Sequence, residues 1–202
     1  MHINGFHIHS DYLDRNAQEG LVDCLRKIVR KAPFFRPTMP RTGKPFSVEM
    51  TSAGVLGWVC DKDGGYRYQK THPVTGNPWE PMPEALVSLW HDLTSYNKPP
   101  ECCLINLYRG DKPRMGLHRD EDEHDLKAPV VSISLGDTAV FRMGGLNRGD
   151  PTRSTKLASG DVVTFGGEAR LSYHGIDRII ANSSTLLRGG GRINLTLRRV
   201  NL

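Results

Sequence analysis

The second half of the chain is a series of short segments in which apolar and polar residues alternate. This pattern restricts the fold more than any other feature of the sequence, because successive side chains of a strand point to opposite faces. Turn residues separate the segments and no helical pattern lies between them, which disfavours parallel βαβ units. We therefore expect a mainly β fold with flanking helices, built as a sandwich, jelly roll or barrel. The predicted strands are CCLINLY, VVSISL, AVFRM, DVVTFG, LSYHG and RINLTLR.

Helical patterns are confined to the first half of the chain. Residues 13–31 carry apolar side chains at helical spacing, and either Asp14 or Asn16 could cap the start of this helix. A second helix is expected over 83–96, before a pair of prolines that prevents its continuation. Residues 34–80 are rich in glycine and loops, with strand candidates in FSVEM and GVLGWV.

Length and composition describe one globular unit. The chain has 202 residues, which we divide into an N-terminal region over 1–100 and a core over 101–202, together one compact catalytic domain. No apolar run is long enough to span a bilayer, and the N-terminus lacks the pattern of a signal peptide. The four cysteines form no C-x-x-C pair, which fits a reducing, cytoplasmic location.

The charge of the chain is basic and unevenly distributed. A formal net charge of +5 favours a polyanionic partner. Residues 26–44 carry seven Lys and Arg and no acid, so this stretch is either a surface that contacts phosphates or a solvated helix face followed by a loop.

One acidic segment, GLHRDEDEHDL over residues 116–126, contrasts with this basic chain. Side chains two apart on a strand share a face, so His118 and Asp120 would project together. His174 follows after 53 intervening residues and could complete a set of two histidines and one carboxylate. Such a set leaves three positions of a metal open, as in the non-haem Fe(II) oxygenases. The alternative is solvated surface charge, since the pattern alone is common.

The last predicted strand adds a second feature. A strand over RINLTLR places Ile193, Leu195 and Leu197 on one face and the polar residues on the other. That polar face is either the wet side of an edge strand or a receptor for a dicarboxylate, because each guanidinium can bind a carboxylate with two hydrogen bonds. The residues of this face are Arg192, Asn194, Thr196 and Arg198, and Asn106 and Tyr108 of INLY could add neutral donors. A metal triad beside a dicarboxylate receptor suggests 2-oxoglutarate.

In this order, INLY, LHRDEDE, APVVSISLG, GGLNRGDP, GDVVTFGGEARLSYHGI and RINLTLR resemble the bacterial AlkB proteins, from about Phe46 to Arg198. These are Fe(II)- and 2-oxoglutarate-dependent dioxygenases that repair alkylated nucleic acid bases. The resemblance implies a double-stranded β-helix, or jelly roll, preceded by a nucleotide-recognition extension. It implies that His118, Asp120 and His174 ligate Fe(II), that Asn106, Tyr108, Arg192, Asn194 and Arg198 bind 2-oxoglutarate, and that O2 is consumed.

The resemblance also implies a set of residues around the substrate base. They are Trp58, Tyr66, Arg67, Tyr68, Asp122 and Arg148, with Met50 near the cosubstrate. The strand face of His118 could extend to Asp122, whose carboxylate would favour the positive charge of a methylated base over an unmodified one. Glu121, Glu123 and Asp125 are expected merely to decorate a turn.

The expected activity is oxidative demethylation of 1-methyladenine and 3-methylcytosine, which releases formaldehyde, succinate and CO2. The substrate would be single-stranded DNA, with double-stranded DNA and RNA left open, and the protein would act as a monomer. Three alternatives remain: a dioxygenase of the same fold acting on a protein or a small molecule, a non-catalytic nucleic-acid-binding jelly roll, and a zinc hydrolase, which leaves the paired arginines unexplained.

Four departures from the relatives affect substrate preference more than chemistry. Phe165 stands where the relatives have Trp, and Ser172 replaces an aromatic residue. The approach to the last strand, LLRGGGR, is richer in glycine, and one extra residue lies between Trp58 and Tyr66.

Overall fold

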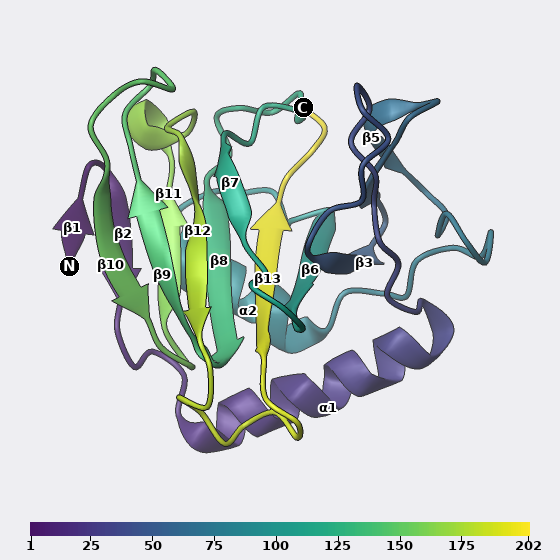
Figure 1. Ribbon diagram of the computed structural model, residues 1–202, viewed down its shortest axis with the longest axis horizontal. Coiled ribbons are helices and arrows are strands. Elements are labelled where there is room, and N and C mark those ends of the chain that lie inside the picture. The colour runs from purple at the N-terminus through teal and green to yellow at the C-terminus, as the bar shows by residue number, and fades with distance from the viewer.

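Two antiparallel sheets face each other, and two helices pack on the outer side of the larger one in the computed structural model, which describes residues 1–202 (Figure 1). The larger sheet has seven strands in the order β1-β2-β11-β8-β13-β6-β3, and the smaller has four in the order β10-β9-β12-β7. A separate hairpin consists of β4 and β5. This arrangement confirms the predicted mainly β jelly roll with flanking helices.

The elements of the larger sheet are β1 (His2–Ile3), β2 (Phe6–His9), β11 (Val162–Phe165), β8 (Val130–Gly136), β13 (Arg192–Arg198), β6 (Cys102–Tyr108) and β3 (Glu49–Gly54). The smaller sheet contains β10 (Arg153–Leu157), β9 (Thr138–Met143), β12 (His174–Ile180) and β7 (Met115–His118). The hairpin strands are β4 (Gly57–Asp61) and β5 (Gly65–Gln69), the helices are α1 (Arg15–Lys31) and α2 (Glu84–Leu93), and a 3-10 turn spans Gly167–Ala169.

The core is divided by the larger sheet into two layers. On the outer side, Leu21 and Leu25 of α1 and Trp90 of α2 pack against the apolar face of β13, which carries Leu195 and Leu197. A second cluster fills the space between the two sheets and includes aromatic side chains from both. The opposite, polar face of β13 therefore points into the space between the sheets, and this places its functional groups in the interior.

Both helices form where the spacing predicts them. Asp14 is the N-cap of α1, because its carboxylate accepts a hydrogen bond from the backbone N–H of Ala17 at 2.8 Å. The second helix is shorter than expected and ends at Leu93, with Thr94 in an extended conformation. Neither helix is long and apolar enough to cross a membrane.

The strand predictions are accurate in the centre of the large sheet and poor at its edges. CCLINLY and RINLTLR form β6 and β13 with the predicted bounds. The segment LSYHG does not form a strand as a whole, because the chain is turning out of the 3-10 helix until β12 begins at His174. The sequence patterns missed β1, β2, β5 and β10, and the strand assumed through His118 and Asp120 is β7, which ends at His118.

Strands from the two halves of the chain share one sheet. From the first 100 residues, β3 pairs with β6 and β2 pairs with β11. The N-terminal region is thus continuous with the core, and its β4–β5 hairpin stands beside the large sheet (Figure 1).

The cap of α1 gives a test of the local structure. Replacing Asp14 with Ala removes the acceptor for the Ala17 N–H and should lower the free energy of unfolding by about 1 kcal/mol. Glu19→Ala is the control, because Glu19 forms only an exposed pair with Arg15 and such pairs contribute little. Urea denaturation measures both values, and equal losses would contradict the role of the cap.

Candidate metal centre and substrate cavity

A cavity of about 300 Å³ opens between the two sheets and the hairpin. Its wall includes both faces that the sequence singled out, the polar face of β13 and the acidic segment after β7. Of the predicted site residues, the wall contains His118, Asp120, His174, Asn106, Tyr108, Arg192, Asn194, Arg198, Trp58, Tyr66, Asp122 and Arg148, and also Met50. Arg67 and Tyr68 are not among the lining residues.

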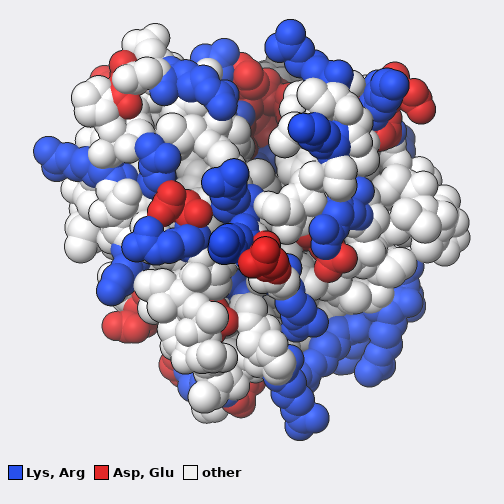
Figure 2. Space-filling view, viewed as in Figure 1, with Lys and Arg blue, Asp and Glu red and all other residues white.

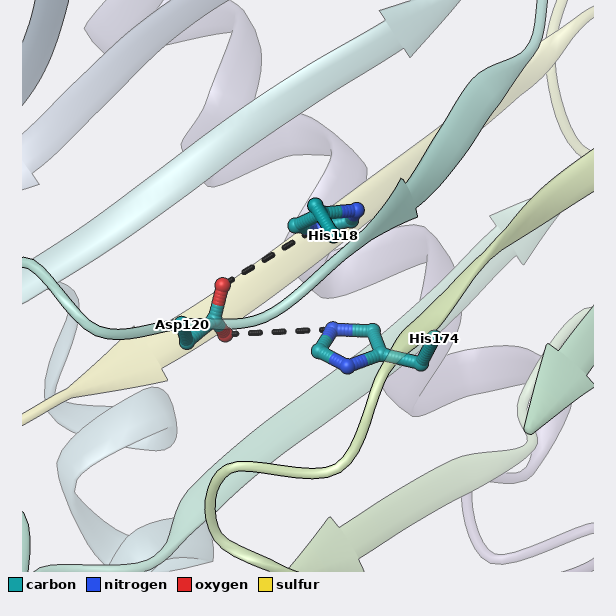
Figure 3. A group of neighbouring side chains, drawn as sticks. All are labelled: His118, Asp120 and His174. Atoms are coloured by element: carbon teal, nitrogen blue, oxygen red, sulfur yellow. Dashed lines mark ion pairs between the residues drawn. The ribbon is translucent and has the colours of Figure 1, made fainter. Parts of the chain in front are cut away.

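Two histidines face each other across neighbouring strands. His118 ends β7, His174 begins β12, and the two are directly paired in the register of these antiparallel strands. Their ring centroids lie 4.6 Å apart. The Nε2 atoms of His118 and His174 lie 3.8 and 3.9 Å from the carboxylate oxygens of Asp120 (Figure 3). The ligand atoms of the three residues all lie within 4.8 Å of one another, so one ion could contact all three.

Asp120 reaches this position by a different route from the predicted one. The strand β7 ends at His118, and residues 119–129 contain neither helix nor strand. The argument that Asp120 and Asp122 share a strand face with His118 is therefore wrong, although Asp120 and His118 do converge. Other contacts must hold the carboxylate in place.

The protonation of the two histidines suits metal binding. The Nδ1 atom of His118 lies 2.9 Å from the carbonyl of Gly116, and that of His174 lies 3.0 Å from the carbonyl of Ser172. Because a carbonyl oxygen only accepts, both Nδ1 atoms carry the proton and both Nε2 lone pairs face Asp120. Burial lowers the pKa of His174 to about 4, with His118 adding to the effect, so the ring is neutral at physiological pH.

Several buried polar atoms in the cavity have no partner within the protein. They are Asp120 Oδ2, Asn106 Oδ1, Arg192 Nε and Nη1, and Arg198 Nε. Arg192 is 1% exposed, and its guanidinium donates to the Ser134 hydroxyl, lies over the ring of Tyr108 and forms an ion pair with no carboxylate. A buried guanidinium without a carboxylate is costly. The orphaned atoms thus fit a cation at Asp120 and an anion at Arg192.

The position of β13 decides between the two interpretations of its polar face. The strand lies between β8 and β6, in the interior of the large sheet, and all its residues are buried. The interpretation of β13 as an edge strand with a solvated face is therefore wrong. Its polar residues instead form the floor of the cavity.

Comparison with known proteins places this cavity in context. The model of the 2OG-Fe(II) oxygenase superfamily matches residues 5–198. The alpha-ketoglutarate-dependent dioxygenase AlkB homolog of Caulobacter vibrioides is 55% identical over 199 residues, which cover 98% of this chain and 88% of that protein. The alpha-ketoglutarate-dependent dioxygenase AlkB of Escherichia coli is 41% identical over 188 residues, 91% of this chain and 85% of its own length.

The chain belongs to the AlkB family of Fe(II)- and 2-oxoglutarate-dependent dioxygenases. Its cofactors are accordingly Fe(II) and 2-oxoglutarate. The fold agrees, since the solved structure of OsALKBH1 superposes with a TM-score of 0.82 at 30% identity and covers 98% of each chain.

An aromatic pair stands at the cavity of this AlkB protein. Trp58 of β4 and Tyr66 of β5 stack with ring centroids 5.8 Å apart and an interplanar angle of 26°. Trp58 is 8% exposed, whereas Tyr66 is 54% exposed. The indole Nε1 of Trp58 donates to Asp122 Oδ2 at 2.8 Å. Burial raises the pKa of Asp122, and the hydrogen bond from Trp58 opposes this shift.

The other two predicted hairpin residues point elsewhere. Arg67 pairs with Asp61 at 2.7 Å and does not reach the cavity. The hydroxyl of Tyr68 donates to Glu123 and accepts from Arg198 at 3.1 Å. Neither side chain lines the cavity, whereas Trp58 and Tyr66 do.

Two acidic residues of the segment 116–126 are buried. The prediction that they merely decorate a turn is therefore wrong for these two. Glu123 is 4% exposed and Asp125 is 1% exposed. Glu123 binds Arg170 at 3.0 Å, and Asp125 accepts from the Tyr96 hydroxyl at 2.5 Å. Glu121 is exposed, as expected, and pairs with Arg119. Sequence reasoning also missed Arg170, because no local pattern distinguishes a buried arginine from a solvated one.

Two arginines flank an aromatic ring in the cavity wall. The guanidiniums of Arg119 and Arg148 lie 5.6 and 5.9 Å from the ring centroid of Tyr173. A separate basic area covers the C-terminal half of α1, where the sequence carries Arg26, Lys27, Arg30 and Lys31 (Figure 2). Arg26 and Lys31 are paired with Asp23 and Glu80, so part of this charge is compensated.

One of the four departures from the related sequences lies directly beside a metal ligand. The ring of Phe165 lies 4.9 Å from that of His174 and lines the cavity. Ser172 supplies its backbone carbonyl to His174, so its side chain can differ without disturbing the ligand.

The low pKa of His174 predicts a pH dependence of the metal-free protein. Unfolded histidine has a pKa near 6.5, above the folded value of about 4, so the unfolded state binds more protons between these values. Stability is then unaffected at pH 7.5 and lower by about 2 kcal/mol at pH 5. Urea denaturation in a chelating buffer measures this loss of stability. His174→Gln should abolish the part of the loss that His174 causes. An equal pH dependence in the variant would contradict the assignment.

Proposed function

We propose that this dioxygenase demethylates 1-methyladenine and 3-methylcytosine in single-stranded DNA, with methylated double-stranded DNA and RNA as further substrates to be tested. The observation that carries the proposal is the carboxylate of Asp122, which accepts a hydrogen bond from one member of a stacked Trp and Tyr pair and lines the cavity that holds the metal triad. Aromatic faces stack on bases, and a carboxylate favours a base that carries a positive charge.

The metal ligands in this proposal are His118, Asp120 and His174. Each histidine offers Nε2, and Asp120 offers Oδ2, which has no other partner. Two histidines and one carboxylate leave three positions open for a bidentate cosubstrate and dioxygen. The bound iron supplies the activation of dioxygen, and the protein supplies orientation and selection. The backbone carbonyls of Gly116 and Ser172 fix the orientation of the two histidine rings toward this site.

The cosubstrate would lie along the polar face of β13. Arg192 binds its distal carboxylate, because its Nε and Nη1 are buried and unpaired. Arg198 lies nearer the metal end, since it contacts Asp120 at 2.8 Å. Asn106, Tyr108 and Asn194 complete this site. The amide of Asn194 is held by Ser132 Oγ and the carbonyl of Ile133.

The base must leave its stack to enter this cavity, because the methyl group lies on the Watson–Crick edge. Trp58 and Tyr66 would stack on the base, each contact contributing about 1–3 kcal/mol. Asp122 lies within reach of the positive ring, and Arg148 at the rim would contact a backbone phosphate. Tyr68 and Arg67 lie outside the cavity wall. Tyr68 contacts Glu123, and Arg67 contacts Asp61.

The overall reaction balances as follows. The methyl group, dioxygen and 2-oxoglutarate give a hydroxymethyl group, succinate and CO2. The C–N bond of the hydroxymethyl adduct then breaks, which releases formaldehyde and the restored base. For a cationic substrate, one proton is also released to solvent.

The cellular setting is part of the proposal. All four cysteines are free, and three of them are buried, which suits the reducing cytoplasm. A monomeric state stays a prediction.

The central test uses one lesion in one strand. The protein is loaded with Fe(II) without oxygen and then exposed to air with 2-oxoglutarate and a single-stranded oligonucleotide that carries one 3-methylcytosine. We expect the oligonucleotide to lose the mass of one CH2 with release of formaldehyde, dependent on both cofactors and absent in His118→Ala. Succinate with an unchanged oligonucleotide would refute the proposed substrate class.

The role of Asp122 is tested with a matched pair of bases. 3-Methylcytosine is cationic and 3-methylthymine is neutral, although both carry the methyl group on N3. Because a carboxylate near the surface interacts with a unit charge by about 1–4 kcal/mol, Asp122→Asn should lower the kcat/KM ratio of the two substrates about tenfold.

Asp63→Asn is the control for this experiment. It removes the same charge from an exposed carboxylate in the turn of the β4–β5 hairpin, but Asp63 does not line the cavity, so the ratio should stay within about twofold. Equal changes in the two variants would show that Asp122 does not contact the charged base.

A further inference from the structure

The carboxylate of Asp120 needs support from outside its own strand. It lies in the irregular segment after β7, so no ladder of backbone hydrogen bonds fixes it. Arg170 Nη1 donates to the backbone oxygen of Asp120 at 2.6 Å, and Arg198 Nη2 donates to its Oδ1 at 2.8 Å. One arginine thus fixes the backbone and the other fixes the side chain, which leaves Oδ2 free.

A single buried carboxylate joins these two arginines. The Oε2 atom of Glu123 accepts from Arg170 Nη2 at 3.0 Å, and its Oε1 atom lies 3.5 Å from Arg198 Nη1. The side chain of Glu123 is fully buried. Arg170 also donates from Nε to the carbonyl of Ala128 at 2.9 Å, which ties together the two ends of the irregular segment.

The hydroxyl of Tyr68 links Arg198 to Glu123 and completes this hydrogen-bond network. It accepts from Arg198 Nη1 at 3.1 Å and donates to Glu123 Oε1. Tyr68 belongs to β5, the strand that also carries Tyr66, and it is paired with Trp58 in the register of the hairpin. The hairpin that carries the base-stacking pair is therefore hydrogen-bonded to the residues that hold Asp120.

The charges of this set require Glu123. Arg170 and Arg198 are balanced by Asp120 and Glu123, and all four side chains are at most 7% exposed. Without Glu123 the set would bury one uncompensated positive charge, which is strongly unfavourable. Arg198 would then be drawn more firmly to Asp120, whose negative charge the metal needs.

We propose that Glu123, Arg170 and Tyr68 are positioning residues that set the alignment of Asp120 and Arg198 and couple it to the β4–β5 hairpin. The proposal rests on the roles proposed above for Asp120 in metal binding and Arg198 in cosubstrate binding. It assigns a function to two residues, Glu123 and Arg170, that touch neither the metal nor the base.

The same segment contains a matched control for this network. Asp125 is also buried, and it accepts a hydrogen bond from the hydroxyl of Tyr96. It forms no hydrogen bond or ion pair with Asp120, Arg170 or Arg198. Changes at Asp125 and Tyr96 therefore remove a buried carboxylate–tyrosine contact of the same kind without touching the metal ligand.

The experiment compares Glu123→Gln and Tyr68→Phe with Asp125→Asn and Tyr96→Phe in the full chain. Mn(II) replaces Fe(II), so that binding is measured without turnover. The readouts are the Kd for Mn(II) by electron paramagnetic resonance, the Kd for 2-oxoglutarate with Mn(II) bound by calorimetry, and the Tm of the metal-free protein.

Loss of a residue that supports a metal ligand typically weakens metal binding 10- to 100-fold. We expect Glu123→Gln to weaken Mn(II) binding by about this factor, and Tyr68→Phe to weaken 2-oxoglutarate binding several-fold. The two controls should stay within about twofold of the wild type in both Kd values, even where their Tm falls. The double variant of Glu123 and Tyr68 should lose less than the sum of the single losses in binding free energy, because the two side chains act through one contact.

Equal Kd values in Glu123→Gln and Asp125→Asn would overturn the proposal and leave Glu123 a purely structural residue. If Glu123→Gln does not fold, Tyr68→Phe decides, since it removes only one hydroxyl: an unchanged Kd for 2-oxoglutarate then overturns the proposal. These measurements involve no nucleic acid, so they can support the positioning role even if 3-methylcytosine proves not to be a substrate. A wild-type protein that binds 2-oxoglutarate equally with and without Mn(II) would instead refute the proposed cosubstrate site.

Discussion

Burial of two guanidiniums in an interior strand of the large sheet is the constraint on which the rest of the site depends. Arg192 and Arg198 lie at opposite ends of the polar face of β13, and both are almost inaccessible to water. They differ in how their charge is balanced. Burial alone would lower the pKa of Arg198, but Asp120, Tyr68 and Glu123 together raise it well above the usual value. The pKa of Arg192 is lowered by burial, and no carboxylate lies beside it.

This difference makes the two ends of the cavity electrostatically unequal. The protein itself neutralises the end near Asp120, so Arg198 is already committed to internal carboxylates. At the other end, the Nε and Nη1 atoms of Arg192 have no hydrogen-bond partner. A ligand with a carboxylate at each end would gain most by placing its free carboxylate at Arg192 and its metal-binding end toward Asp120. The orientation proposed for 2-oxoglutarate thus follows from which arginine lacks a partner.

Sequence patterns predicted the strands in which every second side chain faces the same surroundings along the whole strand. In β13 every second residue faces the helices, so the alternation of Ile193, Leu195 and Leu197 with polar residues identified both faces. Several short strands at or next to the sheet edges were missed for the converse reason. β2 has only Phe6 and Ile8 as buried apolar residues, and β10 is largely exposed, so neither offers a pattern long enough to recognise.

The metal ligands were found from sequence, but the geometry that holds them was not. The strand spacing that suggested His118 and Asp120 applies only to the first of them, since β7 ends there. The side chains that hold Asp120 come from positions 170 and 198, far along the chain. A carboxylate that pairs with an arginine about 50 residues away has the same local sequence as one in water. Glu123 and Asp125 were misjudged for this reason.

The acidic segment in this basic chain is therefore not an acidic surface. Its five acids from position 120 to 125 separate by depth: Asp120 is buried and faces the metal site, whereas Glu121 and Asp122 are exposed and line the cavity. Glu123 and Asp125 are buried under them and bind side chains from other elements. Most of this negative charge lies inside or at the cavity, where it meets arginines, a metal or a cationic ligand. The outer surface keeps its positive balance, so attraction to a polyanion and selection of a cation inside can coexist in one molecule.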